Sequence, residues 1–241
     1  MTQDGITRDF TWRSEFPRLY GLYVLSDRTH PDNYFTKAFE GKFACNPTGT
    51  RMSFGPLEKA LQGLDGDAWK NLAEKARPWT TKKEPLRQWS QLFNHLYEAF
   101  GYEWLAKNGY TSIRFIDRRV KEAKQTPELL GKSATSTALL EVKTINNSDE
   151  DIASRARRPP PVFNLAAPLP EGLKRKLADD VEKARQQLMT FEEPVDRRIV
   201  LVVINPDCAF WLNAAVYQEI NELAAKLSTG GLEVVMRNLV T

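Results

Sequence analysis

The fold is decided by the stretch Pro127-Glu128-Leu129-Leu130-Gly131 and, after a short polar loop, by Leu139-Leu140-Glu141-Val142-Lys143-Thr144-Ile145. The second half is a run of apolar and β-branched residues, which predicts a strand whose side chains alternate between two faces. Glu141 and Lys143 then share a face with apolar neighbours, where burial is costly unless the charges are paired or bind a metal. The first half can turn through Gly131 and run back antiparallel, which would carry Glu128 to the same place.

The length and composition of the chain limit its domain organisation and the kinds of site that it can carry. The chain has 241 residues, enough for one domain with a full core, or for one domain with a sizeable appendage. No apolar run approaches the roughly 20 residues of a membrane span, and residues 1–11 lack the apolar region of a signal peptide. Cys45 and Cys208 suggest neither a disulfide framework nor a zinc site, so we expect a cytoplasmic protein. The net charge of +3 permits nucleic-acid binding without arguing for it.

Residues 1–81 are rich in aromatic side chains, with Gly and Pro recurring between them. They predict an N-terminal extension of irregular and helical elements, with helices near Leu57–Leu64 and Asp67–Ala76 and with Asp67 as the cap of the second helix. A packed extension and a module that recognises a substrate or partner are both compatible with this pattern. Residues 82–241 are expected to form the main domain.

A long helix is predicted over Leu86–Lys107 by one apolar stripe at helical spacing: Trp89, Leu92, Phe93, Leu96, Phe100 and Trp104. Glu98 falls on the other side of this helix, and Glu103 falls inside the stripe. His95 is also off the stripe, so we expect it on the surface.

The rest of the chain alternates strands with helices. Strands are expected at 111–117, 128–130, 139–145, 198–204 and 232–236, and helices near 172–189 and 216–227. The unbroken apolar run from Arg198 to Ile204 is typical of a central strand covered on both faces. This order predicts an α/β sandwich around a mixed sheet, with an antiparallel hairpin that carries the charged residues.

The Pro127-Glu128 segment, followed by Glu141-Val142-Lys143 on an adjacent strand, resembles the PD-(D/E)xK nuclease superfamily. The resemblance implies a restriction-endonuclease-like core with a central mixed sheet flanked by helices. Glu128 departs from the pattern, since the family usually has Asp at this position. Family members often carry a Glu in the first helix, followed by Leu, then Gly and an aromatic residue. Glu98 fits this arrangement, with Leu105, Gly109 and Tyr110 after it, and Glu103 is its rival.

The resemblance also implies a chemistry. Glu128, Glu141 and the backbone carbonyl of Val142 would bind Mg²⁺ or Mn²⁺, with Glu98 touching the metal or its water shell. Hard divalent cations prefer oxygen ligands, and they remove the repulsion between two neighbouring carboxylates. Lys143 would hold the attacking water and help to neutralise the phosphate.

Basic residues near this region predict contacts with nucleic acid. Arg155, Arg157 and Arg158 precede a proline-rich loop, which is either a phosphate-binding segment or a basic linker. Lys174 and Lys176 lie on the charged face of the helix predicted at 172–189. Family members often have a Gln or Lys in this helix that points to the site, and both Gln186 and Gln187 are available.

These features predict a metal-dependent endonuclease that hydrolyses phosphodiester bonds, with DNA as the expected substrate. The alternative is a nuclease-fold module with a weakened site that holds nucleic acid or a partner protein without cutting. A third reading is a structural subunit that forms oligomers through its aromatic N-terminal region, and a homodimer is compatible with double-strand cutting. His30 and His95 supply too few histidines for a histidine-based metal site, and no Walker or dinucleotide glycine motif occurs.

Overall fold

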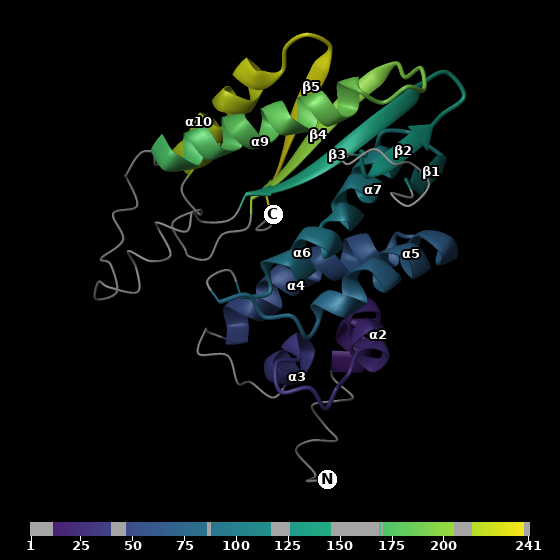
Figure 1. Ribbon diagram of the computed structural model, residues 1–241, viewed down its shortest axis with the longest axis vertical. Helices are drawn as coiled ribbons and strands as arrows, with labels where there is room; N and C mark the ends of the chain where they lie inside the picture. Colours follow the sequence, from purple (N-terminus) through teal and green to yellow (C-terminus); the bar gives the residue numbers. More distant parts are fainter. Residues whose placement is uncertain are drawn as a thin grey trace. The chain divides into compact units, whose positions relative to one another are not determined.

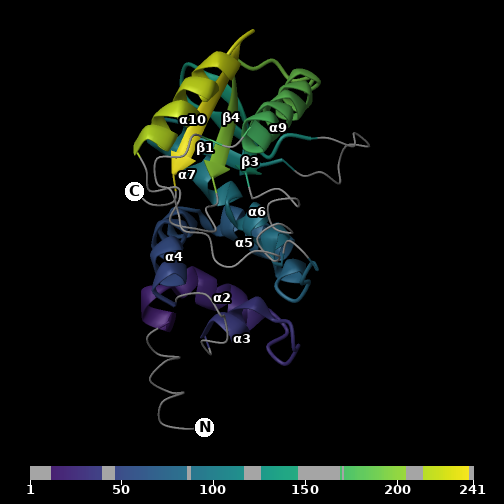
Figure 2. The same ribbon diagram turned by 90° about the vertical axis from the view of Figure 1, so that its left-hand side faces the viewer.

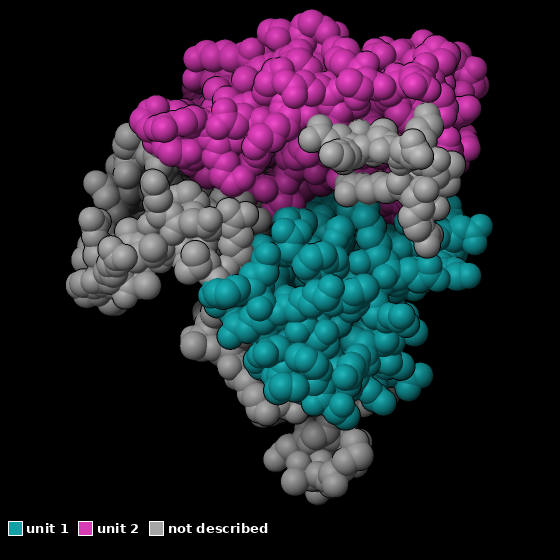
Figure 3. All heavy atoms as spheres, in the orientation of Figure 1, with its two compact units in different colours: residues 1–100, 240–241 teal, residues 101–239 magenta. Residues whose placement is uncertain are grey.

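The computed structural model describes residues 12–39, 47–85, 88–116, 126–145, 169, 171–204 and 214–238. These residues form two compact units, which divide between Phe100 and Gly101 (Figure 3). The boundary expected at residue 81 from composition stays a prediction. Within the described residues, no helix is both long enough and apolar enough to cross a bilayer.

The first unit is helical. Its elements are α2 (Pro17–Leu25), α3 (Tyr34–Phe39), α4 (Pro47–Gln62), α5 (Gly66–Ala76), the 3-10 turn η1 (Arg77–Trp79), α6 (Ser90–Leu96) and the start of α7 (Glu98–Lys107) (Figure 1). Asp65, and not Asp67, caps α5, because its side chain accepts the backbone amide of Ala68 at 2.8 Å. The helix begins at Gly66, one residue before Asp67, so Asp67 lies within its first turn.

The aromatic residues of the first unit pack against one another. The Tyr34 ring lies 5.4 Å from the Trp89 ring and 5.1 Å from the Phe93 ring, both edge to face. Phe16 and Phe54 meet in the same way at 5.8 Å. Edge-to-face pairs of buried rings stabilise a core beyond the area that they bury. The aromatic composition of this region therefore makes a hydrophobic core.

The long helix predicted over Leu86–Lys107 is wrong in one respect, since two helices, α6 and α7, occupy that stretch. They meet at Tyr97, whose carbonyl accepts the amide of Phe100 at 3.0 Å, a tighter bond than the α-helical one. Tyr102 and Leu105 of α7 are buried.

The second unit is built on a five-stranded mixed sheet with strand order β1-β2-β3-β4-β5. The strands are β1 (Ser112–Phe115), β2 (Leu129–Lys132), β3 (Thr137–Ile145), β4 (Arg197–Ile204) and β5 (Leu232–Asn238), with helices α9 (Glu171–Met189) and α10 (Ala214–Leu227). β1, β2 and β3 pair antiparallel, whereas β3, β4 and β5 pair parallel. The α/β fold with a mixed sheet flanked by helices is confirmed.

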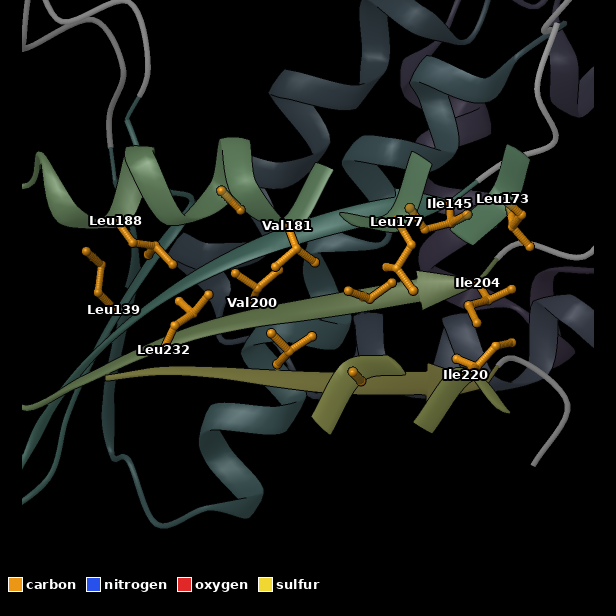
Figure 4. Close-up of a cluster of buried hydrophobic side chains, with 14 of the residues drawn as sticks. Leu139, Ile145, Leu173, Leu177, Val181, Leu188, Val200, Ile204, Ile220 and Leu232 are labelled. Carbon is orange, nitrogen blue, oxygen red and sulfur yellow. The ribbon is translucent and has the colours of Figure 1, made fainter. Parts of the chain in front are cut away.

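Two helices cover one face of this sheet. α9 connects β3 to β4, and α10 connects β4 to β5, so each spans a parallel crossover (Figure 2). Leu139 and Ile145 of β3 join Leu177 and Val181 of α9 in a buried cluster that continues across β4 and β5 (Figure 4). Since side chains alternate along a strand, Glu141 and Lys143 lie on this same face.

The opposite face of the sheet packs on α7. A Cβ atom added to Gly101 would come within 2.8 Å of side-chain atoms of Leu140 and Val142. Only a glycine allows the helix backbone to approach these strands so closely. The predicted central strand is confirmed as well, because β4 is buried continuously from Ile199 to Ile204.

Candidate active site

The candidate site lies where β2 stops pairing with β3. The register ends at the pair of Leu129 with Leu140, and Glu128 directly precedes β2. The Glu128 carboxylate still reaches β3, because it accepts the backbone amide of Val142, the residue after Glu141. Glu128 and Glu141 are therefore neighbours at this end of the hairpin.

Glu128 is fixed by hydrogen bonds of both its side chain and its backbone carbonyl. Its side-chain Oε2 accepts the backbone amide of Val142 at 2.8 Å, and its own carbonyl accepts the amide of Ile116 at 2.8 Å. Pro127, which precedes it, has no amide proton and cannot extend the ladder. The Glu128 residue is 7% exposed. Its position is thus set by the two strands on either side of it.

Glu141 is buried and forms an ion pair with Lys143, whose side chain is 22% exposed. Lys143 Nζ donates to Oε1 of Glu141 at 2.5 Å, and the Glu141 residue has no exposed surface. Within the described residues, the second oxygen of this carboxylate, Oε2, is buried and has no hydrogen-bond partner. Buried polar atoms nearly always have a partner, and an orphan of this kind calls for an ion or a water. The free oxygen of Glu141 is the feature of the site that most needs a ligand.

Gln187 completes the surroundings of Lys143. Lys143 Nζ donates a second hydrogen bond, to Gln187 Oε1 at 2.7 Å. Gln187 is buried beside Ala184 and Leu188 on the inner side of α9, whereas Gln186 is exposed and contacts Glu182 at 3.5 Å. The choice between the two glutamines, open in the sequence, is decided by which of them faces the sheet. The hydrogen bonds to Glu141 and Gln187 together fix the position of the Lys143 ammonium group.

These residues fit a divalent cation with few protein ligands. Within the described residues, no group of three or more His, Cys, Asp and Glu side chains is placed to hold a metal. Mg²⁺ usually keeps several waters and takes one or two carboxylates, together with phosphate oxygens of the substrate. Glu128 and Glu141 are two such carboxylates. A cation bound there would give the unpartnered Oε2 of Glu141 a partner.

Glu98 has partners of its own in the first unit. Lys75 Nζ donates to its Oε2 at 2.5 Å, and His95 Nδ1 lies 3.1 Å from its Oε1. Burial raises the pKa of Glu98, but the His95 hydrogen bond and the Lys75 charge outweigh burial and hold that pKa below its usual range. The expected surface position of His95 is wrong, since its side chain is 17% exposed. A metal-binding role for Glu98 stays a prediction.

Glu103, the rival of Glu98, is also paired. Lys107 Nζ lies 2.6 Å from its Oε1, and Arg237 reaches its Oε2 at 3.0 Å from β5. This pairing explains how a carboxylate tolerates a half-buried place in α7. The ion pair with Arg237 also links α7 to the edge strand β5.

The cations predicted to contact nucleic acid are placed only in part. Arg155, Arg157 and Arg158 lie outside the described residues. Lys174 is bonded to Glu171 at 2.8 Å and to Glu219 at 2.6 Å, and these two hydrogen bonds raise its pKa. Lys176 is bonded to Asp180 at 2.5 Å. Both lysines are neutralised locally, and their contact with nucleic acid stays a prediction.

One residue of this region was missed in the sequence. Thr126 is buried, and its hydroxyl oxygen has no hydrogen-bond partner among the described residues. Thr126 stands two residues before Glu128 and precedes β2, which begins at Leu129, so no strand or helix periodicity in the sequence singled it out.

Comparisons with known proteins add little to this geometry. No family model matches the chain, and no curated protein matches it. Among solved structures, the chain is similar to Pyrococcus furiosus SfsA in complex with Ca²⁺, with a TM-score of 0.24 and 12% sequence identity. The match covers 62% of this chain and 55% of that one, so the chain matches about half the length of its neighbour. A TM-score this low does not establish a shared fold.

Proposed function

We propose that this protein is a metal-dependent nuclease that hydrolyses phosphodiester bonds, with DNA as the expected substrate. The observation that carries the proposal is the carboxylate of Glu141, which is fully buried, bonded to Lys143 through one oxygen and unpartnered through the other. The proposal is supported by the Glu128 carboxylate, which accepts the backbone amide of Val142, the residue after Glu141, at 2.8 Å.

Glu128 and Glu141, together with the carbonyl of Val142, would hold Mg²⁺ or Mn²⁺, which when bound lowers the pKa of a water and offsets charge on the phosphate. Lys143 places its ammonium group beside the same carboxylate, where it can hydrogen-bond the attacking water and oppose the phosphate charge. Gln187 helps to fix the position of the Lys143 ammonium group, because its Oε1 accepts one of the three hydrogen bonds that this group can donate.

The test is cleavage of plasmid and single-stranded DNA in Mg²⁺, in Mn²⁺ and in EDTA. E141Q and K143M should each lower the cleavage rate by about 10²-fold or more, because each removes a group that acts on the reacting phosphate or its water. The matched controls are E193Q and K107M, whose side chains are 45% and 58% exposed. They should cleave like the wild type. Unchanged cleavage by E141Q or by K143M would refute the site.

The second candidate is a module that binds nucleic acid without cutting. It is favoured by the hydrogen bonds that already occupy Glu128 and Lys143, and by Glu in place of the usual Asp at position 128. Retention of DNA in EDTA by the wild-type protein, with no cleavage in either metal, would support this candidate over the nuclease.

A further inference from the structure

Lys143 is the counter-ion of the carboxylate that the proposed function assigns to the metal. Its ammonium nitrogen lies 2.5 Å from Oε1 of Glu141, a residue with no exposed surface. A buried carboxylate is costly unless a positive charge accompanies it. Among the described residues, Lys143 is the side chain that supplies this charge to Glu141.

The ammonium group of Lys143 is fixed beside Glu141. Gln187 Oε1 accepts a second hydrogen bond from it at 2.7 Å, and Gln187 is 9% exposed on the inner side of α9. Moving the ammonium group away would break two charge-assisted hydrogen bonds, one of them to a fully buried acceptor. The positive charge of Lys143 therefore stays close to any ligand that binds the other oxygen of Glu141.

The buried carboxylate of Glu98 is satisfied differently. Lys75 Nζ donates to its Oε2 at 2.5 Å, and His95 Nδ1 lies 3.1 Å from its Oε1, so both oxygens have a partner. On Glu141 the lysine takes one oxygen, and Oε2 has no hydrogen-bond partner among the described residues. A cation that binds Oε2 would therefore share a single carboxylate with Lys143.

Two positive charges on one carboxylate repel each other. A positive neighbour within about 4–6 Å lowers the affinity of a carboxylate for a proton by about 10- to 1,000-fold, and a divalent cation meets the same repulsion with twice the charge. We propose, on the basis of the proposed function, that Lys143 limits the affinity of the site for its divalent cation, because it already balances the charge of Glu141.

The test measures Mn²⁺ affinity without nucleic acid, from the electron paramagnetic resonance signal of free Mn²⁺, at about pH 8, where carboxylates are ordinarily ionised. K143M should bind Mn²⁺ at least about tenfold more tightly than the wild type, because the repelling charge is gone. K143R keeps the charge and should bind like the wild type. K143Q removes the charge but keeps a hydrogen-bond donor for Glu141, so it should bind as tightly as K143M and carries the test if K143M does not fold.

Thermal melting gives a second measurement. In EDTA, K143M should melt at a lower temperature than the wild type, because Glu141 stays buried without its counter-ion. Mn²⁺ should raise the melting temperature of K143M by more than that of the wild type, since a ligand that binds more tightly stabilises more. The control is K107M, which removes an equal charge from a side chain that is 58% exposed and should leave the Mn²⁺ affinity unchanged.

Mn²⁺ affinities of K143M and K143Q that equal or fall below the wild-type value would overturn the role of Lys143. E141Q separates this result from a failure of the proposed function. If E141Q loses Mn²⁺ binding while K143M and K143Q bind no more tightly than the wild type, only the inference on Lys143 fails. If E141Q binds Mn²⁺ like the wild type, the metal site itself is wrong and both proposals fail.

Discussion

Gly101 decides how closely α7 approaches the sheet. A Cβ atom at this position would lie 2.6 Å from Cδ1 of Leu129 and 2.8 Å from side-chain carbons of Leu140 and Val142. Three contacts below the van der Waals limit cannot all be relieved in a core that is fully packed. The absence of a side chain at one residue thus sets the geometry behind the strand that bears Glu141.

G101A should therefore lower the free energy of unfolding by about 1–3 kcal/mol, measured by urea denaturation. The matched control is G172A, at a helical glycine of the same unit where an added Cβ meets nothing within 4 Å. It should keep or slightly raise the stability. Equal stability of G101A and wild type would show that the strands can move away from α7.

At the scale of the elements, α2 is capped by a residue from another helix. Phe16, at the N-cap of α2, makes no side-chain capping bond. The carboxylate of Glu58 in α4 caps the helix instead, because it accepts hydrogen bonds from the backbone amides of Arg18 at 2.8 Å and Leu19 at 3.0 Å. Glu58 is 3% exposed and also accepts a bond from Gln62. A negative charge at a helix N-terminus is favourable, so this contact joins α2 to α4.

E58A should destabilise the protein by about 1–2 kcal/mol, because the first amides of α2 lose their acceptor in a buried place. Urea denaturation followed by circular dichroism measures the loss. The adjacent Lys59 is exposed, so K59A serves as the control and should unfold like the wild type. An E58A protein as stable as K59A would mean that water replaces the carboxylate without cost.

At the scale of the whole molecule, acid sensitivity follows from one buried carboxylate. The pKa of Glu98 lies below its ordinary value of 4.5 in the folded state, because His95 and Lys75 outweigh the effect of burial. A depressed pKa contributes stability that is present above the unfolded pKa and is lost as the pH falls through the folded pKa.

E98Q should therefore be less stable than the wild type near neutral pH, by about 1–3 kcal/mol, and the difference should shrink below about pH 4. Urea denaturation from about pH 7 to about pH 3 gives both curves. E74Q, at an exposed glutamate of α5, is the control and should follow the wild type at every pH. Parallel curves for E98Q and the wild type would show that Glu98 does not titrate differently on folding.

The sequence by itself determined the class of the fold and the residues of the hairpin. The apolar and β-branched run of β3 and the unbroken apolar run of β4 are local patterns, and they predicted a mixed sheet with Glu141 and Lys143 on one face. The apolar spacing of α9 likewise predicted its length, because a helix face against a sheet must repeat at helical spacing.

Only the tertiary structure decided how each charge is satisfied. The pairing of Glu98 with Lys75 and the selection of Gln187 over Gln186 both depend on residues far apart in the chain. The physical reason is that the cost of a buried charge or hydroxyl depends on which groups folding brings within hydrogen-bond distance, and local periodicity carries no information about those partners.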